Sequence, residues 1–114
     1  MTVFKDAVPG SYSVYVIELD RTVSRHGRFR RANPDYRGAK PCVYVGSSTH
    51  LPDVRFDQHK EGYKSNRFVQ KYGTRLLPEL YEKYNTIPTR DDAVEIEAYL
   101  ARRLRQAGYG VWSH

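Results

Sequence analysis

The stretch from residue 42 to residue 59 constrains the fold more than any other part of this sequence. Residues 42–45 alternate in the manner of a half-buried strand, and the run breaks at Gly46, where serine and threonine hydroxyls offer helix caps. In the helix that follows, Arg55 and His59 are four residues apart and therefore lie on one face. Local geometry alone thus brings a strand end, a guanidinium and an imidazole close together.

Length and composition favour a single soluble domain over residues 1–114. A chain of 114 residues with 39% apolar and 28% charged side chains can build one modest core. No apolar run approaches the roughly 20 residues of a membrane span, and residues 1–6 lack the apolar core of a signal peptide. We therefore expect a cytoplasmic protein with no membrane partner. The lone Cys42 is expected to fill the core, with a reactive thiol as the alternative.

The charge balance suits a polyanionic partner. The formal net charge is +6, and the chain contains ten tyrosines and four phenylalanines. Basic groups bind a phosphate backbone, and aromatic rings stack on bases. Charge alone leaves two readings open, a nucleic-acid-binding protein and a small basic protein that is merely soluble.

The N-terminal third predicts a strand followed by a basic loop. Residues 11–19 are rich in β-branched and aromatic side chains and indicate a strand, with Tyr15 and Ile17 on one face. Residues 20–40 show no sustained apolar period and predict a long hairpin loop. Its seven cations are Arg21, Arg25, Arg28, Arg30, Arg31, Arg37 and Lys40. We interpret it as an arm that grips phosphates, the alternative being a solvated connector.

The remaining elements follow from turn and capping signals. A second strand over 41–47 should run antiparallel to the first, and a helix over about 51–61 should end at Gly62. Residues 65–73 predict a short helix capped near Ser65. For residues 76–87 we favour a third strand that begins near Pro78. A helix over about 90–107, with Thr89 as its cap, precedes a short extended segment at 109–112.

Glu97 falls inside the apolar stripe of this last helix. The stripe consists of Ala93, Ile96, Leu100 and Leu104, at spacings of three and four residues. An inward carboxylate is costly unless a cation, a metal ion or hydrogen bonds receive it. Glu97 therefore either pairs with a buried arginine for structural reasons or serves a site, whereas Glu95 points to the opposite side.

Together these residues resemble the GIY-YIG nuclease superfamily. Ser13-Val14-Tyr15 and Tyr44-Val45-Gly46 are similar to its two name-giving tripeptides, with Val for Ile in both and Ser for Gly in the first. The segment from Gly46 through Arg55 to His59 resembles the family's arginine helix, and Glu97 stands where the family keeps its metal-binding glutamate. The similarity runs from about residue 12 to residue 111.

Two features depart from the family pattern. The basic segment at about 20–40 is longer than the family's usual compact hairpin, which we interpret as an insertion. The family also tends to place an asparagine after an aromatic residue near the C-terminal end, and here Tyr109 is followed by Gly110. Its absence would lower activity unless Asn66 or Asn85 takes its place.

The resemblance implies an α+β fold, a small three-stranded antiparallel sheet flanked by helices, and a metal-dependent phosphodiester hydrolase acting on nucleic acid, with DNA favoured. Arg55 would stabilise the phosphorane, and Glu97 would hold one Mg²⁺ or Mn²⁺ ion. Tyr15 would act as the base or orient the water, with His59 as a relay and Tyr44 as an orienting group.

Further substrate contacts are expected outside this group. Arg25, Arg28, Arg30, Arg31 and Lys64 are the candidate DNA-binding residues. The alternative function is a non-catalytic nucleic-acid-binding module of the same fold, for which Gly110 is the best hint. The sequence does not decide between single- and double-stranded substrates, DNA and RNA, or monomer and dimer, nor does it give a sequence preference or a biological role.

Overall fold

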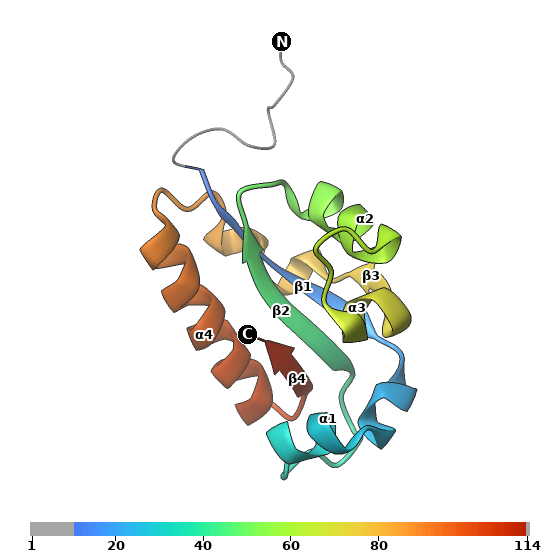
Figure 1. Cartoon of the computed structure of the whole chain (residues 1–114). Coiled ribbons are helices and arrows are strands. Elements are labelled where there is room, and N and C mark those ends of the chain that lie inside the picture. The colour runs from blue at the N-terminus through green and yellow to red at the C-terminus, as the bar shows by residue number, and fades with distance from the viewer. Residues whose placement is uncertain (1–10, 114) are drawn as a thin grey trace.

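The computed structural model describes residues 11–113, and its centre is a mixed sheet of four strands in the order β3-β1-β2-β4 (Figure 1). The strands are β1 (Ser13–Leu19), β2 (Cys42–Ser48), β3 (Gly73–Leu76) and β4 (Gly110–Ser113). β1 is antiparallel to both β2 and β3, whereas β2 and β4 are parallel. The expected α+β class and the antiparallel pairing of the first two strands are confirmed.

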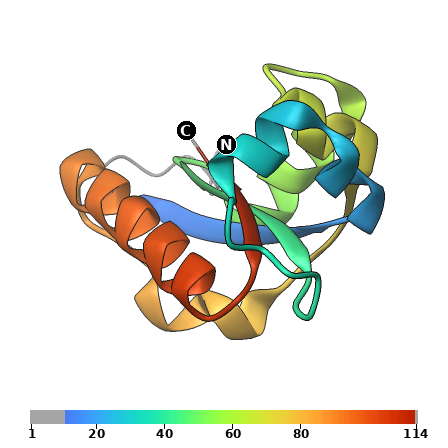
Figure 2. The same cartoon turned by 90° about the horizontal axis from the view of Figure 1, so that it is seen from below.

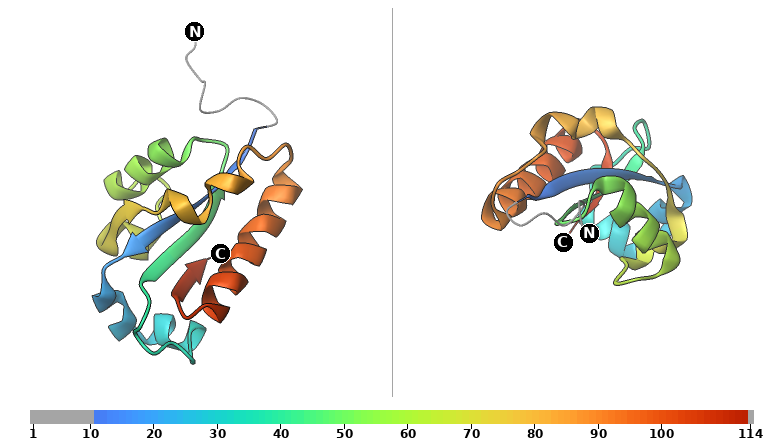
Figure 3. Two further views of the ribbon diagram at one scale, coloured as in Figure 1. Left: turned by 180° about the vertical axis from the view of Figure 1, so that it is seen from behind. Right: turned by 90° about the horizontal axis from the view of Figure 1, so that it is seen from above.

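Helical segments cover both faces of this sheet (Figures 2 and 3). The helices α1 (Gly27–Ala32), α2 (Pro52–Glu61) and α3 (Arg67–Tyr72) lie on one face. The 3₁₀ segments η3 (Pro78–Leu80) and η4 (Glu82–Tyr84) lie on the other, and α4 (Arg90–Gln106) packs against β2 and β4. Because both faces are covered, Val14, Val16 and Ile17 are all fully buried. The two central strands are thus core strands, not the half-buried strands that alternation predicted.

The basic segment at 20–40 is not a loop, as was expected, but contains two short helices. These are η2 (Arg21–Arg25) and α1, joined at His26. Val23 and Phe29 are completely buried and anchor the two turns to the core. Two anchors in two short turns are too few to produce an apolar period, which explains the wrong prediction.

The third strand also lies elsewhere than predicted. β3 ends at Leu76, before the predicted start of the strand near Pro78, and residues 78–84 form η3 and η4. Pro78 lacks the N–H that a ladder requires, so it starts a turn here instead of a strand. Asn85 continues the pairing with β1 by its side chain, whose amide and carbonyl both bond the backbone of Val14.

The three predicted helices are confirmed, with small shifts at the ends. Gly62 ends α2 with φ of 89°, a left-handed conformation that glycine adopts without strain. Asn66, not Ser65, caps α3. Thr89 accepts a hydrogen bond from the Asp92 amide at 3.1 Å and caps α4. Among residues 11–113, no helix is both long and apolar enough to cross a bilayer.

The fourth strand corrects the predicted three-stranded antiparallel sheet. After α4 the chain returns beside β2 in the same direction, because a helical crossover joins parallel strands. The buried side chain of Asn33 pairs with Val111 as a neighbouring strand would. It accepts from the Val111 amide at 2.8 Å and donates to the Val111 carbonyl at 2.9 Å. Asn33, which the sequence did not single out, therefore fixes β4 in place.

Candidate active site

The site is organised by the close approach of Tyr15 to Gly46. These residues are paired across β1 and β2. A Cβ atom on residue 46 would lie 2.6 Å from Tyr15 Oη and 2.9 Å from Tyr44 Cε2. Only glycine therefore lets the Tyr15 phenol lie across the strand, with its ring centre 6.1 Å from that of Tyr44.

His59 reaches the Tyr15 hydroxyl from α2. Both side chains are buried, and His59 Nε2 lies 3.0 Å from Tyr15 Oη. On the other side of the imidazole, the backbone N–H of Asn66 donates to Nδ1 at 3.1 Å. Since Nδ1 accepts, the proton of the neutral ring is on Nε2. His59 therefore donates to the Tyr15 oxygen. No pattern in the sequence indicates that the Asn66 amide orients the imidazole.

The pKa values of both phenols, Tyr15 and Tyr44, are raised. Burial raises the pKa of Tyr15 to about 12, against the opposing effect of the nearby Arg55 cation, while the Glu97 carboxylate also raises it. Burial likewise raises the pKa of Tyr44 well above its ordinary range, with contributions from Tyr15 and Glu97. Both phenols are therefore protonated at neutral pH in the absence of substrate. They also lie within electrostatic reach of both Arg55 and Glu97.

The Arg55 guanidinium is held by the chain that follows its own helix. Nη2 donates to the Lys64 carbonyl at 2.7 Å, and Nη1 donates to the Tyr63 carbonyl at 3.2 Å and to Gln58 Oε1 at 3.1 Å. Lys64 has φ of 45°, a left-handed conformation that is uncommon for a residue with a side chain. The turn after α2 thus fixes the direction of the guanidinium fork before substrate arrives.

Glu97 comes from α4, whereas Arg55 and His59 come from α2. Its side chain is only 8% exposed, and the Ser47 hydroxyl donates to Glu97 Oε1 at 2.7 Å. Ser47 follows Gly46 directly on β2, so one strand end both admits the Tyr15 ring and receives the carboxylate. Glu97 thus accepts a hydrogen bond from a serine hydroxyl. This geometry does not support the alternative in which Glu97 pairs with a buried arginine.

The structure thus brings together all five expected catalytic side chains, Tyr15, Tyr44, Arg55, His59 and Glu97, and places the expected DNA-binding arginines elsewhere. Arg25, Arg28, Arg30 and Arg31 are exposed on η2 and α1. Lys64 is also exposed and lies over the ring of Tyr63, 5.5 Å from its centre. These exposed cations lie outside the group of five catalytic side chains.

Metal binding would depend on a single carboxylate. Across residues 11–113 there is no group of three or more His, Cys, Asp or Glu side chains that could hold a metal ion. Glu97 offers oxygen ligands, which suit a hard cation such as Mg²⁺ or Mn²⁺. Its donor set fits one such ion only if water and substrate phosphate oxygens supply the other ligands.

Packing explains why residue 110, where an asparagine was expected, is a glycine. A Cβ at this buried glycine would lie 2.9 Å from Phe29 Cε1 and 3.4 Å from Cys42 Sγ, so the core excludes a side chain here. The side chain of Asn66 caps α3, and that of Asn85 bonds the Val14 backbone. The side-chain amides of Asn66 and Asn85 therefore both have structural hydrogen-bond partners.

Comparison with protein families agrees with this geometry. The model of the GIY-YIG catalytic domain matches residues 12–110, nearly the whole chain. No curated protein and no solved structure matches the chain.

Proposed function

This chain belongs to the GIY-YIG family of catalytic domains, a nuclease superfamily, and we propose that it is a divalent-metal-dependent endonuclease that hydrolyses phosphodiester bonds in DNA. One observation carries the proposal. The Tyr15 hydroxyl contacts the His59 imidazole at 3.0 Å, and its pKa is affected by both the Arg55 cation and the Glu97 carboxylate. Tyr15 as the candidate base, Arg55 as the phosphate-binding cation and Glu97 as the metal ligand therefore lie close together.

Tyr15 is the group we assign to the attacking water. The His59 Nε2–H and the positive charge of Arg55 both favour a phenolate oxygen at Tyr15 over a neutral one. At neutral pH the Tyr15 phenol would first lose its proton to solvent. The resulting phenolate would then take a proton from the attacking water, while His59 donates a hydrogen bond to the phenolate oxygen. Tyr44, packed 5.5 Å from the His59 ring, limits the movement of the imidazole and orients the water or its neighbour.

Arg55 is suited to the charge that develops on the phosphate. The fork of a guanidinium matches two phosphate oxygens and donates parallel hydrogen bonds to them. The carbonyls of Tyr63 and Lys64 already fix its direction, so little reorganisation is needed when substrate binds.

Glu97 is the residue that would hold the metal ion. A bound Mg²⁺ or Mn²⁺ supplies Lewis-acid stabilisation of phosphate charge and offsets the carboxylate that raises the pKa of Tyr15. The Ser47 hydroxyl keeps one carboxylate oxygen in place through its 2.7 Å hydrogen bond. The exposed arginines of η2 and α1 would bind phosphates farther along the strand.

The test compares cleavage by wild type and by two site variants. Labelled single- and double-stranded DNA is incubated with Mg²⁺, with Mn²⁺ or with EDTA. We expect metal-dependent nicking by wild type, and a loss of at least about 100-fold in Arg55→Ala and Glu97→Gln. Glu95→Gln is the matched control, because Glu95 is exposed on the same helix. Equal cleavage by Glu97→Gln and Glu95→Gln would refute the assignment of Glu97.

A second function remains in competition because Gly110 leaves the chain without the expected asparagine. In that case the protein would be a non-catalytic nucleic-acid-binding module of the same fold. Salt-sensitive binding of DNA, with no cleavage by wild type in either metal, would favour the module.

A further inference from the structure

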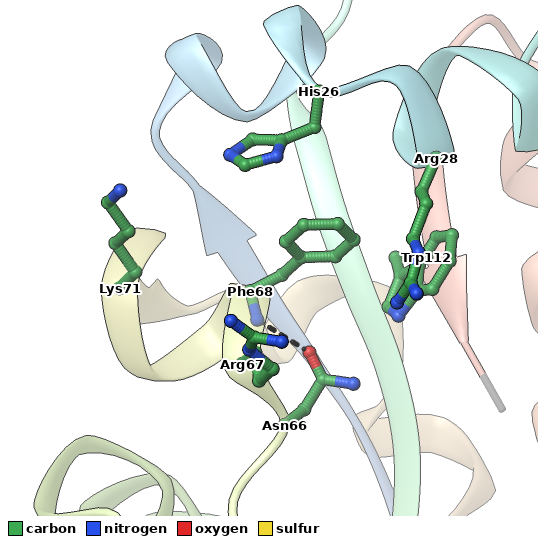
Figure 4. Close-up of a pocket in the computed structure, with 7 residues that line it drawn as sticks. All are labelled: His26, Arg28, Asn66, Arg67, Phe68, Lys71 and Trp112. Atoms are coloured by element: carbon green, nitrogen blue, oxygen red, sulfur yellow. Dashed lines mark hydrogen bonds between the residues drawn. The ribbon is translucent and has the colours of Figure 1, made fainter.

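A pocket lies outside the catalytic group, between three segments that are distant in the sequence. It is lined by His26, Arg28, Asn66, Arg67, Phe68, Lys71 and Trp112, and its volume is about 290 Å³ (Figure 4). α1, α3 and β4 contribute to it, on the same face of the sheet as α2. The catalytic proposal uses none of these side chains except Arg28, as a phosphate contact.

The aromatic side chains form a corner that suits a flat ligand. The rings of Phe68 and Trp112 are 4.8 Å apart and nearly perpendicular, at 80°. A planar group that stacks on one ring would meet the edge of the other. The His26 ring is 5.3 Å from Phe68, and its Nε2 is 2.7 Å from Tyr72 Oη, which fixes the imidazole.

The polar side chains of the pocket suit a phosphate. Arg28, Arg67 and Lys71 are all exposed at the pocket, and none of its seven lining residues is acidic. Three cations without a neighbouring carboxylate in the lining leave a positive surface beside the aromatic corner. An aromatic corner with cations around it is the combination by which proteins bind unpaired nucleotides.

The size of the pocket suits a single base. Its volume of about 290 Å³ is close to the lower end of small-ligand pockets, which is roughly 300 Å³. A base inside an intact duplex has both faces covered by its neighbours, and removing it costs a few kcal/mol. The pocket therefore favours a base that is already unpaired.

Asn66 links this pocket to the proposed active site. Its backbone N–H donates to His59 Nδ1, and its side chain caps the helix that carries Phe68. The same residue thus lines the pocket and touches the imidazole that bonds Tyr15. A nucleotide held in the pocket would be near the one whose phosphate lies at Arg55.

We propose that this pocket binds a single unpaired base of the substrate strand on Phe68 and Trp112, with Arg28, Arg67 and Lys71 on the adjoining phosphates. The proposal rests on the proposed function insofar as the substrate is DNA. It assigns the enzyme to single-stranded DNA, or to DNA that is unpaired near the cleavage site, over intact duplex.

The first experiment uses Trp112 as a probe, because it is the only tryptophan in the chain. Wild-type protein in EDTA is titrated with a thymidine 12-mer and with a 12-base-pair duplex. We expect the 12-mer to quench Trp112 fluorescence, and the duplex to bind with little quenching. Equal quenching by duplex and single strand, or no quenching by either, would overturn the proposal.

The second experiment uses matched lysine variants. Lys71 and Lys83 both lie over the ring of the tyrosine that follows them, at 5.4 and 5.3 Å. Lys71 lines the pocket, whereas Lys83 is exposed on η4, on the other face of the sheet. Lys71→Gln should weaken single-strand binding and reduce the salt slope by about 0.7, as expected for one lost phosphate contact. An equal effect of Lys83→Gln would mean that only net charge matters.

The third experiment tests stacking. Trp112→Ala should weaken single-strand binding by roughly 5- to 150-fold, while Trp112→Phe, which keeps a ring, should restore most of it. Circular dichroism checks that both variants are folded. Unchanged binding by folded Trp112→Ala would refute the pocket.

Different results would refute the proposal for the pocket and the proposed function. Cleavage by wild type with no difference between single strand and duplex, and no quenching, would refute the pocket alone. Quenching by single strand with no cleavage in any metal would leave the pocket standing and refute the nuclease.

Discussion

Replacing Gly46 by alanine tests the arrangement of the site most directly. The added Cβ would lie 2.6 Å from Tyr15 Oη and 2.7 Å from Tyr15 Cζ, well inside the 3.4 Å of ordinary contact. The phenol is 1% exposed and must retreat by the better part of an ångström into a packed core. Overpacking of this kind costs about 1–3 kcal/mol. For a domain of this size, that lowers Tm by roughly 4–18 °C.

The loss of activity should be greater than the loss of folded protein alone would cause. Displacing Tyr15 by this amount changes its 3.0 Å contact with His59, and misplacing a reacting group by about 1 Å costs about 100-fold in rate. Tm is followed by circular dichroism, and nicking is measured at a temperature where the variant is fully folded. Gly108→Ala is the control.

Gly108 controls for stability loss without a change in the site. It has φ of 102°, and a Cβ there would meet only Lys40 Cγ, at 3.4 Å. Alanine at this position costs about 1–2 kcal/mol through backbone strain. Its rate per folded molecule should stay at the wild-type value. A Gly46→Ala protein with the Tm and rate of wild type would refute the placement of the Tyr15 ring.

Three further predictions test the site and its surroundings. Tyr15→Phe should reduce turnover by about 10²- to 10⁴-fold and leave DNA affinity unchanged, since only a hydroxyl is lost; turnover at the wild-type rate would contradict the base assignment. Because burial raises the pKa of Tyr15 from 10.0 to about 12, the unfolded chain releases this proton first. The contribution of Tyr15 to stability should therefore be complete below pH 10 and fall by about 2–3 kcal/mol as the pH rises to about 12, in addition to the fall that the raised pKa of Tyr44 causes. Urea unfolding at pH 9 and 11.5 measures this fall, which should be smaller in Tyr15→Phe. Replacing the three exposed arginines outside the pocket, Arg25, Arg30 and Arg31, by glutamine should flatten the salt dependence of DNA binding by about 0.7–0.9 per lost phosphate contact, and an unchanged slope would show that this segment does not bind the backbone.

Shortening the basic segment would not be an equivalent test of this prediction. An unstructured loop could be shortened without loss of stability, but this segment is folded onto the core. Val23 and Phe29 are fully buried, so deleting them would remove part of the core. Charge removal at exposed positions avoids this problem.

Several site residues could be identified from the sequence because their arrangement depends on short-range geometry. The four-residue spacing of Arg55 and His59 fixes one helix face, and the break at Gly46 marks a strand end. The position of Glu97 in an apolar stripe already required that something receive its carboxylate. In the structure that partner includes the Ser47 hydroxyl, 50 positions away.

Contacts between distant segments could not be predicted in this way. β3 and β4 are four-residue strands, too short for a period, and the pairing of Asn33 with Val111 spans 78 positions. The tautomer of His59 depends on a backbone amide in a turn, and the direction of Arg55 depends on two carbonyls. Nearly every residue type has the same backbone amide and carbonyl, so the sequence does not indicate which of them make these contacts.

Local patterns in the sequence were enough to place the two central strands, the helix that carries Arg55 and the helix that carries Glu97, because periods of two and 3.6 residues follow from local backbone geometry. The folded structure was needed to show that Tyr15, His59 and Glu97 meet, that a fourth strand pairs with β2 at the edge of the sheet, and that Trp112 lies beside Phe68. Those contacts depend on how the core fills its volume, which no local pattern specifies.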